Sequence, residues 1–285
     1  MNQKIEQNNA LTVQNDRNLA SKTRYISISN QKGGVGKTTT AINLATGLAA
    51  VGKTVLVIDL DPQGNASTGL GIDRADRARG AYEVLFGECS LDEAALASKV
   101  PNLFVVSSSV HLSGAEIELI DMENREYILR EALKNSNRYY DYVLFDCPPS
   151  LNLLTLNALV ASSGVLVPLQ CEFFALEGLS HLVNTIERVK GSFNPALELY
   201  GIVLTMFDQR NNLSNDVAAN VREHFGDLVF NTVIPRNVRV SEAPSHGLPA
   251  IVYDMKCNGS RAYINLAKEM LKREKVLKKD QPLAV

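Results

Sequence analysis

The segment "SNQKGGVGKTTTAINLA" constrains the fold of this chain more than any other stretch of its sequence. It follows an apolar run, "RYISIS", and continues into residues with helical periodicity. A strand, a glycine-rich turn and a helix in this order form a loop that holds phosphate groups, because glycines let backbone N–H groups turn inward and the helix contributes its positive N-terminus. The segment therefore predicts an α/β fold with a phosphate-binding loop.

Side chains of this loop have distinct expected roles. Lys37 is placed to reach the β- and γ-phosphates of a nucleotide, and the Thr38 hydroxyl is placed to ligate Mg²⁺. Gln31 stands where the common pattern has its first glycine, so the sequence fits the variant K-G-G-x-G-K-[ST]. This variant adds Lys32, which taken alone would be a solvated surface charge. The residues expected to bind nucleotide in this loop are Lys32, Gly33, Gly34, Val35, Gly36, Lys37, Thr38 and Thr39.

Three aspartates stand at the ends of predicted strands. Asp59 and Asp61 follow "TVLVI", and Asp146 ends "YVLFD". Residues two apart on an extended segment face the same side, so Asp59 and Asp61 can both face the loop. Aspartates at strand ends also serve as helix caps or turn residues, and prolines mark turns after these strands. Because three carboxylates adjoin one phosphate loop, we expect Asp59, Asp146 and Thr38 to hold Mg²⁺.

Short β-branched runs alternate with longer segments of helical period, which is the pattern of parallel strands joined by helices. The expected strands are residues 24–29, 54–59, 102–107, 141–146, 164–169, 199–205 and 228–234. The expected helices are residues 39–50, 114–134, 151–161, 176–190, 213–225 and about 260–275. Together they predict a doubly wound, mostly parallel sheet with helices on both faces and ligands beyond the carboxyl ends of its strands.

One folded domain, residues 24–276, accounts for most of the chain. We expect a disordered polar extension at residues 1–23, which are rich in Asn and Gln, and a flexible tail at residues 277–285. The net charge is −2, from 29 basic and 31 acidic residues, so composition alone gives no reason to expect a nucleic-acid partner. The four cysteines form no CxxC pair, which argues against a zinc ribbon or a redox dithiol.

The string "KGGVGKTT" resembles the deviant Walker A motif of an ATPase family that includes ParA partition proteins, MinD-type cell-division regulators and the nitrogenase iron protein. The resemblance implies ATP and Mg²⁺ as cofactors and a homodimer that forms when ATP binds. It implies that Lys32 reaches across the dimer to the partner's ATP, while Lys37 acts within its own subunit. It also implies that Asp61 positions the attacking water, so the catalytic residues would be Lys32, Lys37 and Asp61.

Later segments are similar to the ParA/Soj chromosome-partitioning ATPases, and the similarity extends from about residue 24 to 275. The segments that carry it are "VPLQCEFFALEGLSHL", "LTMFDQRNNLS" and "TVIPRNVRVSEAPSHGLPAIVYD". The resemblance implies that Met206, Phe207 and Pro235 contribute to the adenine pocket.

The same resemblance implies partners. Arg210 and Arg239, with Arg236 nearby, would contact the DNA backbone without reading sequence, although solvated surface arginines are the alternative. A ParB-type centromere-binding protein would stimulate hydrolysis and release the dimer from double-stranded DNA. The implied protein is cytoplasmic and nucleoid-associated, and it does not bind membranes.

Three other members of the same superfamily offer alternatives. A MinD-like membrane ATPase needs an amphipathic C-terminal anchor, but the segment "KEMLKREKVLKKDQPLAV" has few bulky apolar residues on one face. An iron–sulfur carrier needs cysteines that bridge two subunits, and Cys147 alone suggests this. A dethiobiotin-synthase-like ligase shares the loop, but "SEAPSHG" and "QCEFFALEGL" favour partition.

Overall fold

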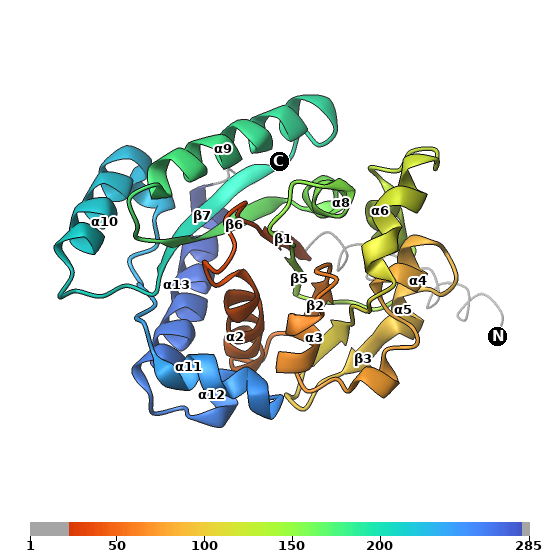
Figure 1. The fold of residues 1–285 in the computed structure, drawn as a ribbon, viewed down its shortest axis with the longest axis horizontal. Helices are drawn as coiled ribbons and strands as arrows, with labels where there is room; N and C mark the ends of the chain where they lie inside the picture. Colours follow the sequence, from red (N-terminus) through yellow and green to blue (C-terminus); the bar gives the residue numbers. More distant parts are fainter. Residues whose placement is uncertain (1–22, 281–285) are drawn as a thin grey trace, which may run out of the picture.

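The computed structural model describes residues 23–280, and of residues 276–280 it describes only the backbone. Seven strands form one sheet in the order β3-β4-β2-β5-β1-β6-β7 (Figure 1). β3 pairs antiparallel with β4, and the other pairs are parallel. The expected doubly wound, mostly parallel sheet is confirmed. The strands are β1 (Arg24–Ile28), β2 (Val55–Asp59), β3 (Ala95–Ala97), β4 (Leu103–Val106), β5 (Tyr142–Asp146), β6 (Gly164–Gln170) and β7 (Glu198–Thr205).

The predicted strands differ from the observed ones at the two edges of the sheet. The predicted strand at residues 228–234 is wrong: the segment makes two backbone hydrogen bonds to β7, from Phe230 N to Ile202 O and from Ile234 N to Leu204 O, both 2.8 Å, without forming a ladder. Its apolar character reflects burial, since Phe230 is fully buried. The unpredicted strand β3 has only three residues, two of them alanine, too few to show an alternating pattern.

The helices flank the sheet and are interrupted more often than predicted. The expected helix at residues 114–134 is two helices, because Asn124 takes a left-handed conformation (φ 53°) between them. The α-helices are α2 (Lys37–Ala50), α3 (Asn65–Gly69), α4 (Ala81–Leu85), α5 (Leu91–Ala94), α6 (Leu112–Ile120), α7 (Ile128–Lys134), α8 (Leu153–Ala161), α9 (Ala175–Ser192), α10 (Asn212–Phe225), α11 (Val238–Glu242), α12 (Ala250–Tyr253) and α13 (Asn258–Asp280). Short 3₁₀ turns are η1 (Arg74–Asp76), η2 (Gly226–Leu228) and η3 (Ala243–His246).

Alternate side chains of the strands enter two cores on opposite faces of the sheet. Val57 packs in a cluster with Leu44 of α2 and Met270 of α13. Its neighbour Ile58 packs on the other face with Ala158 of α8. Figure 1 shows α2 and α13 on one side of the strands and α8 and α9 on the other. Burial on both faces explains why the strands are apolar almost throughout.

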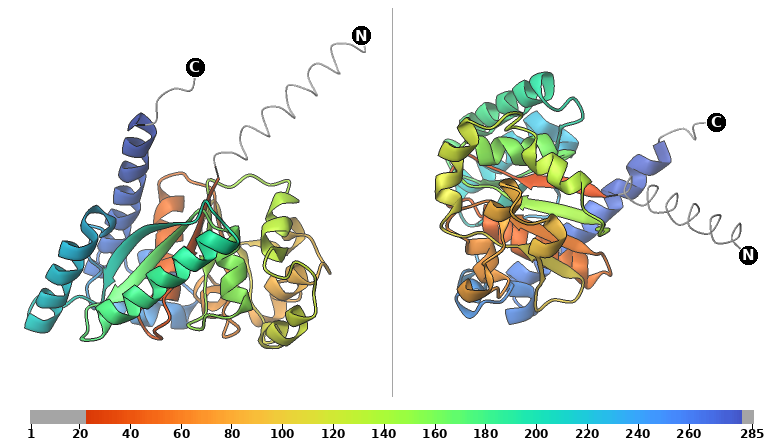
Figure 2. Two further views of the ribbon diagram at one scale, coloured as in Figure 1. Left: turned by 90° about the horizontal axis from the view of Figure 1, so that it is seen from above. Right: turned by 90° about the vertical axis from the view of Figure 1, so that its right-hand side faces the viewer.

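The C-terminal helix is fastened to the sheet by a buried carboxylate. Tyr142 and Tyr200 donate hydrogen bonds to Glu274 of α13, at 2.7 and 3.1 Å. Figure 2 shows α13 running past the body of the molecule, and it ends at Asp280, so the expected tail at residues 277–285 begins inside this helix. The predicted disordered extension at residues 1–23 lies outside the described residues apart from Thr23. The limits of the domain at 24 and 276 stay predictions.

Strand register brings the predicted site residues together. Asp146 at the end of β5 is paired in register with Asp59 of β2 on one side and with Ile28 of β1 on the other. β1 leads directly into the glycine loop and then into α2, which begins at Lys37. The carboxyl ends of β1, β2 and β5 therefore form one edge, where the site of such a fold is expected.

Candidate functional site

The glycine loop has the conformation of a phosphate loop and is held from two sides. Gly34 and Gly36 have positive φ values of 76° and 90°, which side-chain-bearing residues rarely adopt. Asn30 accepts a hydrogen bond from Lys32 N at 3.0 Å. From the other side, the Thr205 hydroxyl at the end of β7 donates to Val35 O at 2.8 Å. The loop is therefore fixed to β7 as well as to its own strand.

Lys37 points back into this loop. Its side chain is buried, with 7% of the residue exposed, and its Nζ donates to Lys32 O at 3.0 Å. Burial lowers the pKa of Lys37, and the nearby charge of Asp146 opposes that shift. A backbone carbonyl is a neutral acceptor, so an anionic phosphate oxygen at this position would bind the ammonium more strongly.

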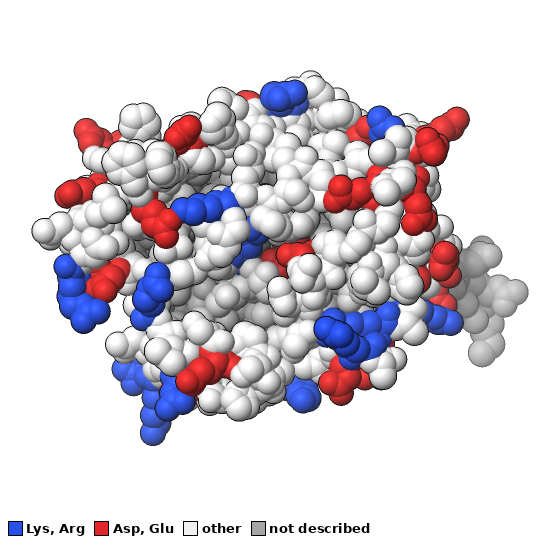
Figure 3. Space-filling view, viewed as in Figure 1, with Lys and Arg blue, Asp and Glu red and all other residues white. Residues whose placement is uncertain are grey.

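Lys32, in contrast, lies on the surface. Almost half of its side chain is exposed, and its ammonium forms an ion pair with Glu172 at the start of the β6–α9 loop. Figure 3 shows the face seen in Figure 1, with a hollow near its middle and both basic and acidic side chains on the rim. The ammonium of Lys32 is thus paired at the surface, whereas the ammonium of Lys37 points into the loop.

Asp146 is a buried carboxylate without a hydrogen bond. It is fully buried, and among the described residues neither carboxylate oxygen has a partner with hydrogen-bond geometry. Burial, followed by the charge of Asp59, raises the pKa of Asp146 well above its ordinary value, while the Thr38 hydroxyl and the Lys37 ammonium oppose the shift. An unpaired carboxylate in this position is a ready ligand for a divalent cation, and the Thr38 hydroxyl is nearby.

Asp59 is equally buried, but both of its carboxylate oxygens accept hydrogen bonds. Its Oδ2 accepts hydrogen bonds from Ser67 N at 2.8 Å and from the Ser67 hydroxyl at 2.7 Å, and its Oδ1 accepts one from Asp61 N at 3.2 Å. Burial raises the pKa of Asp59 to about 6, and these hydrogen bonds oppose the shift. The two aspartates predicted to hold Mg²⁺ therefore differ: Asp146 is free to bind a cation, and Asp59 shapes the turn that carries Asp61.

The residues predicted for the adenine pocket lie close to one another. Phe207 N donates to Ile234 O at 3.0 Å, and Phe207 forms an isolated parallel bridge with Pro235. Both line a cleft of about 820 Å³. Met206 is in the left-handed region (φ 49°), and a side chain built on Gly36 would meet its Cε at 3.8 Å. Met206 is therefore directed toward the phosphate loop rather than into that cleft.

The three arginines predicted to contact DNA differ in their partners. Arg210 forms a two-point ion pair with Asp208, at 3.0 Å for each contact, and holds the pKa of Asp208 at about 2. Arg239 pairs with Glu242 at 3.0 Å. Arg236 is exposed and pairs with no carboxylate whose side chain the structure describes. Arg210 and Arg236 line one cleft, and Arg239 lies on α11.

Sequence reasoning missed four residues of this site. They are Asn30 and Thr205, which fix the loop, Ser67, which satisfies Asp59, and Glu172, which pairs with Lys32. Thr205 and Glu172 both stand at the carboxyl ends of strands, so the rule that located the aspartates could have indicated them. Ser67 gave no comparable signal, because its contact depends on how α3 packs after β2.

The fold and the glycine loop define a P-loop ATPase with two lysines in its phosphate loop. A family model described as "AAA domain" matches residues 23–199. The chromosome partitioning protein ParA of Caulobacter vibrioides is 59% identical over 258 residues, which cover 90% of this chain and 97% of that protein. The sporulation initiation inhibitor protein Soj of Bacillus subtilis is 51% identical over 247 residues, which cover 87% and 98%. The chain therefore belongs to the ParA/Soj family of chromosome-partitioning ATPases.

A solved structure supports the same fold. Cobyrinic acid a,c-diamide synthase from Mycobacterium smegmatis, with bound ADP and magnesium, aligns with a TM-score of 0.77 at 36% identity, over 89% of this chain and 96% of that one. Its name is that of a biosynthetic enzyme, whereas the ParA and Soj relatives match this chain at higher identity. Within residues 23–280, no helix combines the length and hydropathy needed to cross a membrane.

Proposed function

We propose that this chain is an ATP-driven switch that segregates DNA. It binds Mg·ATP, dimerises, binds double-stranded DNA without sequence preference, and is reset by hydrolysis that a ParB-type centromere-binding protein stimulates. The observation that carries this proposal is the buried, unpartnered carboxylate of Asp146 beside Lys37. Such a group is unfavourable in the interior unless a cation completes the site.

Thr38 and Asp146 are the residues that would hold magnesium. A bound Mg²⁺ would neutralise charge on the phosphate oxygens and fix their orientation. Asp59 acts indirectly, because its oxygens already accept hydrogen bonds from Ser67 and from the backbone of Asp61. The adenine would lie in the cleft beside Phe207 and Pro235, and Met206 would border it on the side of the phosphate loop. The relative from Mycobacterium smegmatis with ADP and magnesium supports this choice of ligands.

Hydrolysis needs few groups, because phosphoryl transfer depends chiefly on positioning and charge stabilisation. Lys37 is already inside the loop and would stabilise charge on the β- and γ-phosphates. Asp61 follows Asp59 in a turn closed by the hydrogen bond from Gly64 N to Asp61 O at 2.9 Å. We assign to Asp61 the orientation of the attacking water.

Lys32 would act on the nucleotide of a second subunit. The Lys32 ammonium is exposed and pairs with Glu172, whereas the Lys37 ammonium donates a hydrogen bond inside the loop. Breaking an exposed ion pair costs little, so Lys32 can leave Glu172 for the phosphates of a partner. Each site is then incomplete until two copies meet, which ties hydrolysis to dimerisation.

DNA binding would use Arg210, Arg236 and Arg239. Contacts to phosphate give affinity that falls steeply with salt and carries no sequence information. A dimer presents two copies of this surface, so ATP-dependent dimerisation raises DNA affinity through avidity. The protein would then reside in the cytoplasm on the nucleoid, and its slow turnover would keep it bound until its partner arrives.

The decisive experiment measures ATP turnover of the full chain with plasmid DNA and with a synthetic peptide of the N-terminus of the ParB-type partner. Each is added separately and then together. We expect a synergistic increase when both are present. Turnover that is indifferent to both would contradict the proposal.

A variant pair tests the role of Lys32 in the same assay. Lys32→Ala should retain nucleotide binding but lose ATP-driven dimerisation and turnover. The matched control is Lys53→Ala, which also removes a lysine from an ion pair, with Asp141, but away from the loop. A monomeric Lys32→Ala protein that hydrolyses ATP at the wild-type rate would refute the assignment.

A further inference from the structure

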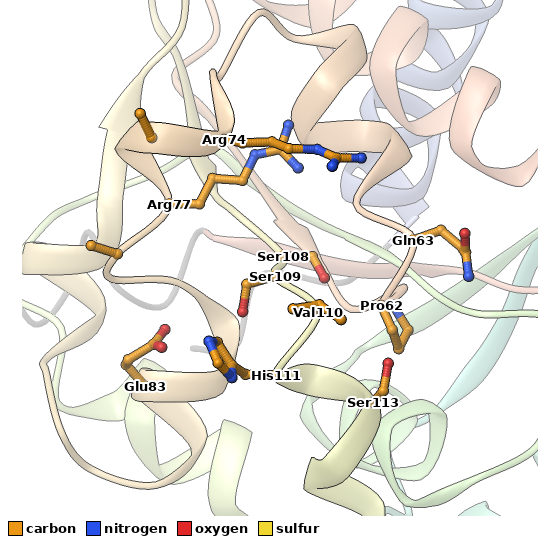
Figure 4. Close-up of a pocket in the computed structure, with 12 residues that line it drawn as sticks. Pro62, Gln63, Arg74, Arg77, Glu83, Ser108, Ser109, Val110, His111 and Ser113 are labelled. Carbon is orange, nitrogen blue, oxygen red and sulfur yellow. The ribbon is translucent and has the colours of Figure 1, made fainter.

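A second cavity lies next to the turn that carries Asp61 and has no part in the proposed function. It has a volume of about 580 Å³, which is within the usual range for small-molecule sites. Arg74 and Arg77 form one wall, and the segment from Ser108 to His111 forms another (Figure 4). Pro62 and Gln63, immediately after Asp61, close a third side.

Two serine hydroxyl groups in this cavity have no hydrogen-bond partner. Ser108 is fully buried, and both its Oγ and the Oγ of Ser109 lack a partner among residues 23–275. Buried polar groups in proteins are almost always hydrogen-bonded, so an unpaired pair indicates a missing partner. Figure 4 shows the Ser109 hydroxyl directed toward His111 and the Ser108 hydroxyl directed toward Val110. Ser108 and Ser109 both line the cavity, so a molecule bound there is the nearest candidate for the missing partner.

The arginine wall is positively charged and partly preorganised. Arg77 is fixed by hydrogen bonds from its guanidinium to Ile72 O at 2.7 Å and to Gly64 O at 3.3 Å, both neutral acceptors. Neither Arg74 nor Arg77 pairs with a carboxylate whose side chain the structure describes. Glu83 also lines the cavity, but its Oε2 accepts a hydrogen bond from Gly80 N at 2.7 Å. In Figure 3, basic side chains gather over the orange segment of Figure 1 that holds η1.

We propose that this cavity binds a small phosphorylated molecule. Guanidinium groups and serine hydroxyls together are donors that match the oxygens of a phosphate group. The cavity is larger than one phosphate needs, so it has room for an organic part beside Pro62, Val110 and His111. A ligand here would touch the turn after Asp61, and Ser108 N donates to the Ser67 hydroxyl, at 3.0 Å, which in turn bonds Asp59.

Calorimetry with inorganic pyrophosphate tests the proposal. The full chain carries Lys37→Ala throughout, so that the phosphate loop does not contribute to binding. Arg74→Glu in that background should weaken pyrophosphate binding by about tenfold or more. The change replaces a positively charged hydrogen-bond donor by a carboxylate, which has the same sign of charge as pyrophosphate and repels it. Ser108→Ala should weaken it about threefold or more, because one neutral donor is lost.

The matched control is Arg79→Glu. Arg79 is exposed, lies close to Arg77 in the chain, pairs with Glu93 and does not line the cavity. The Arg79→Glu variant should bind pyrophosphate as tightly as the parent protein does. Equal melting temperatures for all variants would show that the fold is intact. No binding by the parent, or equal losses in Arg74→Glu and Arg79→Glu, would overturn the proposal. Parallel titrations with ribose 5-phosphate and AMP distinguish the class of ligand. If ribose 5-phosphate binds more tightly than pyrophosphate, the ligand is a sugar phosphate, and if AMP does, the ligand is a nucleotide.

Discussion

Two buried carboxylates, one on helix α13 and one at the end of strand β5, have opposite surroundings. Glu274 of α13 accepts hydrogen bonds from Tyr142 and Tyr200, while Asp146 at the end of β5 accepts none among the described residues. Both lie in the interior, where an unpaired charge is unfavourable. The fold completes the first group by itself and leaves the second incomplete. The contrast separates a carboxylate whose hydrogen bonds are made by the fold from one whose oxygens have no such partner among the described residues.

The largest expected effect comes from Asp146→Asn, which removes the unpaired charge. ATP turnover should fall about 100-fold or more, since a preorganised group in a water-excluded site is lost. The free energy of unfolding without nucleotide should rise at a pH above the raised pKa of Asp146, because the cost of burying the ionised carboxylate is removed. Steady-state hydrolysis and urea denaturation measure the two effects. If Asp146→Asn were less stable than the wild type and hydrolysed ATP normally, Asp146 would be a stabilising group like Glu274, and the proposed difference between them would be wrong.

The pH dependence of stability gives the next largest effect. Folding raises the pKa of Asp59 from its ordinary 3.8 to about 6 and that of Asp146 well above 3.8. The folded protein therefore holds these protons more tightly than the unfolded chain does. Their contribution to stability is complete below about pH 4. The part from Asp59 is lost as the pH rises to about 6, and the part from Asp146 is lost as the pH rises through its own raised pKa. For Asp59 alone the loss is about 3 kcal/mol.

Urea denaturation of the nucleotide-free protein from pH 4 to pH 8 measures this loss. Asp146→Asn should lose less stability over this range than the wild type does. Added Mg²⁺ should reduce the loss near pH 7 in the wild type and not in the variant. Superimposable curves for the two proteins would contradict the pKa directions.

Glu274→Gln should have the opposite effect to Asp146→Asn: it should lower stability and leave turnover intact, and the change should be smaller. A glutamine side chain is a neutral partner for the two tyrosine hydroxyl groups and cannot pair with the charge of Arg24, so the free energy of unfolding should fall by about 1–3 kcal/mol. ATP turnover should be unchanged. Tyr142→Phe combined with Glu274→Gln should cost less than the sum of the two single changes, because both remove the same interaction. Additive losses would show that the hydrogen bond does not stabilise α13.

The smallest expected effect concerns DNA binding, where an arginine that is paired with a carboxylate can be compared with one that is not. Arg236 is unpaired among the described side chains, whereas Arg210 is paired with Asp208. Arg236→Ala should make the fall of log DNA affinity with log salt concentration less steep, by about one unit of slope, as the loss of one phosphate contact does. Arg210→Ala should change the slope by less, because Arg210 must first leave Asp208. Fluorescence anisotropy with duplex DNA at several salt concentrations measures both, and equal slopes would refute the distinction.

The sequence was sufficient for the parts of the fold that depend on local pattern. The glycine loop, the six parallel strands and the aspartates at strand ends were predicted, because each has a short and characteristic signature. The segment 228–234 was mistaken for a strand, since buried coil and buried strand share the same composition. The break at Asn124 also escaped prediction, because the residues on both sides favour helix.

The candidate site was predicted as a set of residues but not as a set of interactions. Asp59 and Asp146 look equivalent in the sequence, and only the packing of α3 reveals that Ser67 satisfies one of them. The partner of Lys32 was equally hidden, because Glu172 is 140 residues away in the chain. Hydrogen-bond partners across the sheet depend on tertiary structure, which periodicity does not encode.

The hydrogen bond from Thr205 to Val35 connects the phosphate loop to the end of β7. The same strand end continues through Met206 to the cleft lined by Phe207 and Arg210. A displacement of the loop would therefore act on the cleft through one side-chain hydrogen bond and a few covalent bonds. Replacing this threonine by valine would keep the shape of the side chain while uncoupling the mechanical connection between the two.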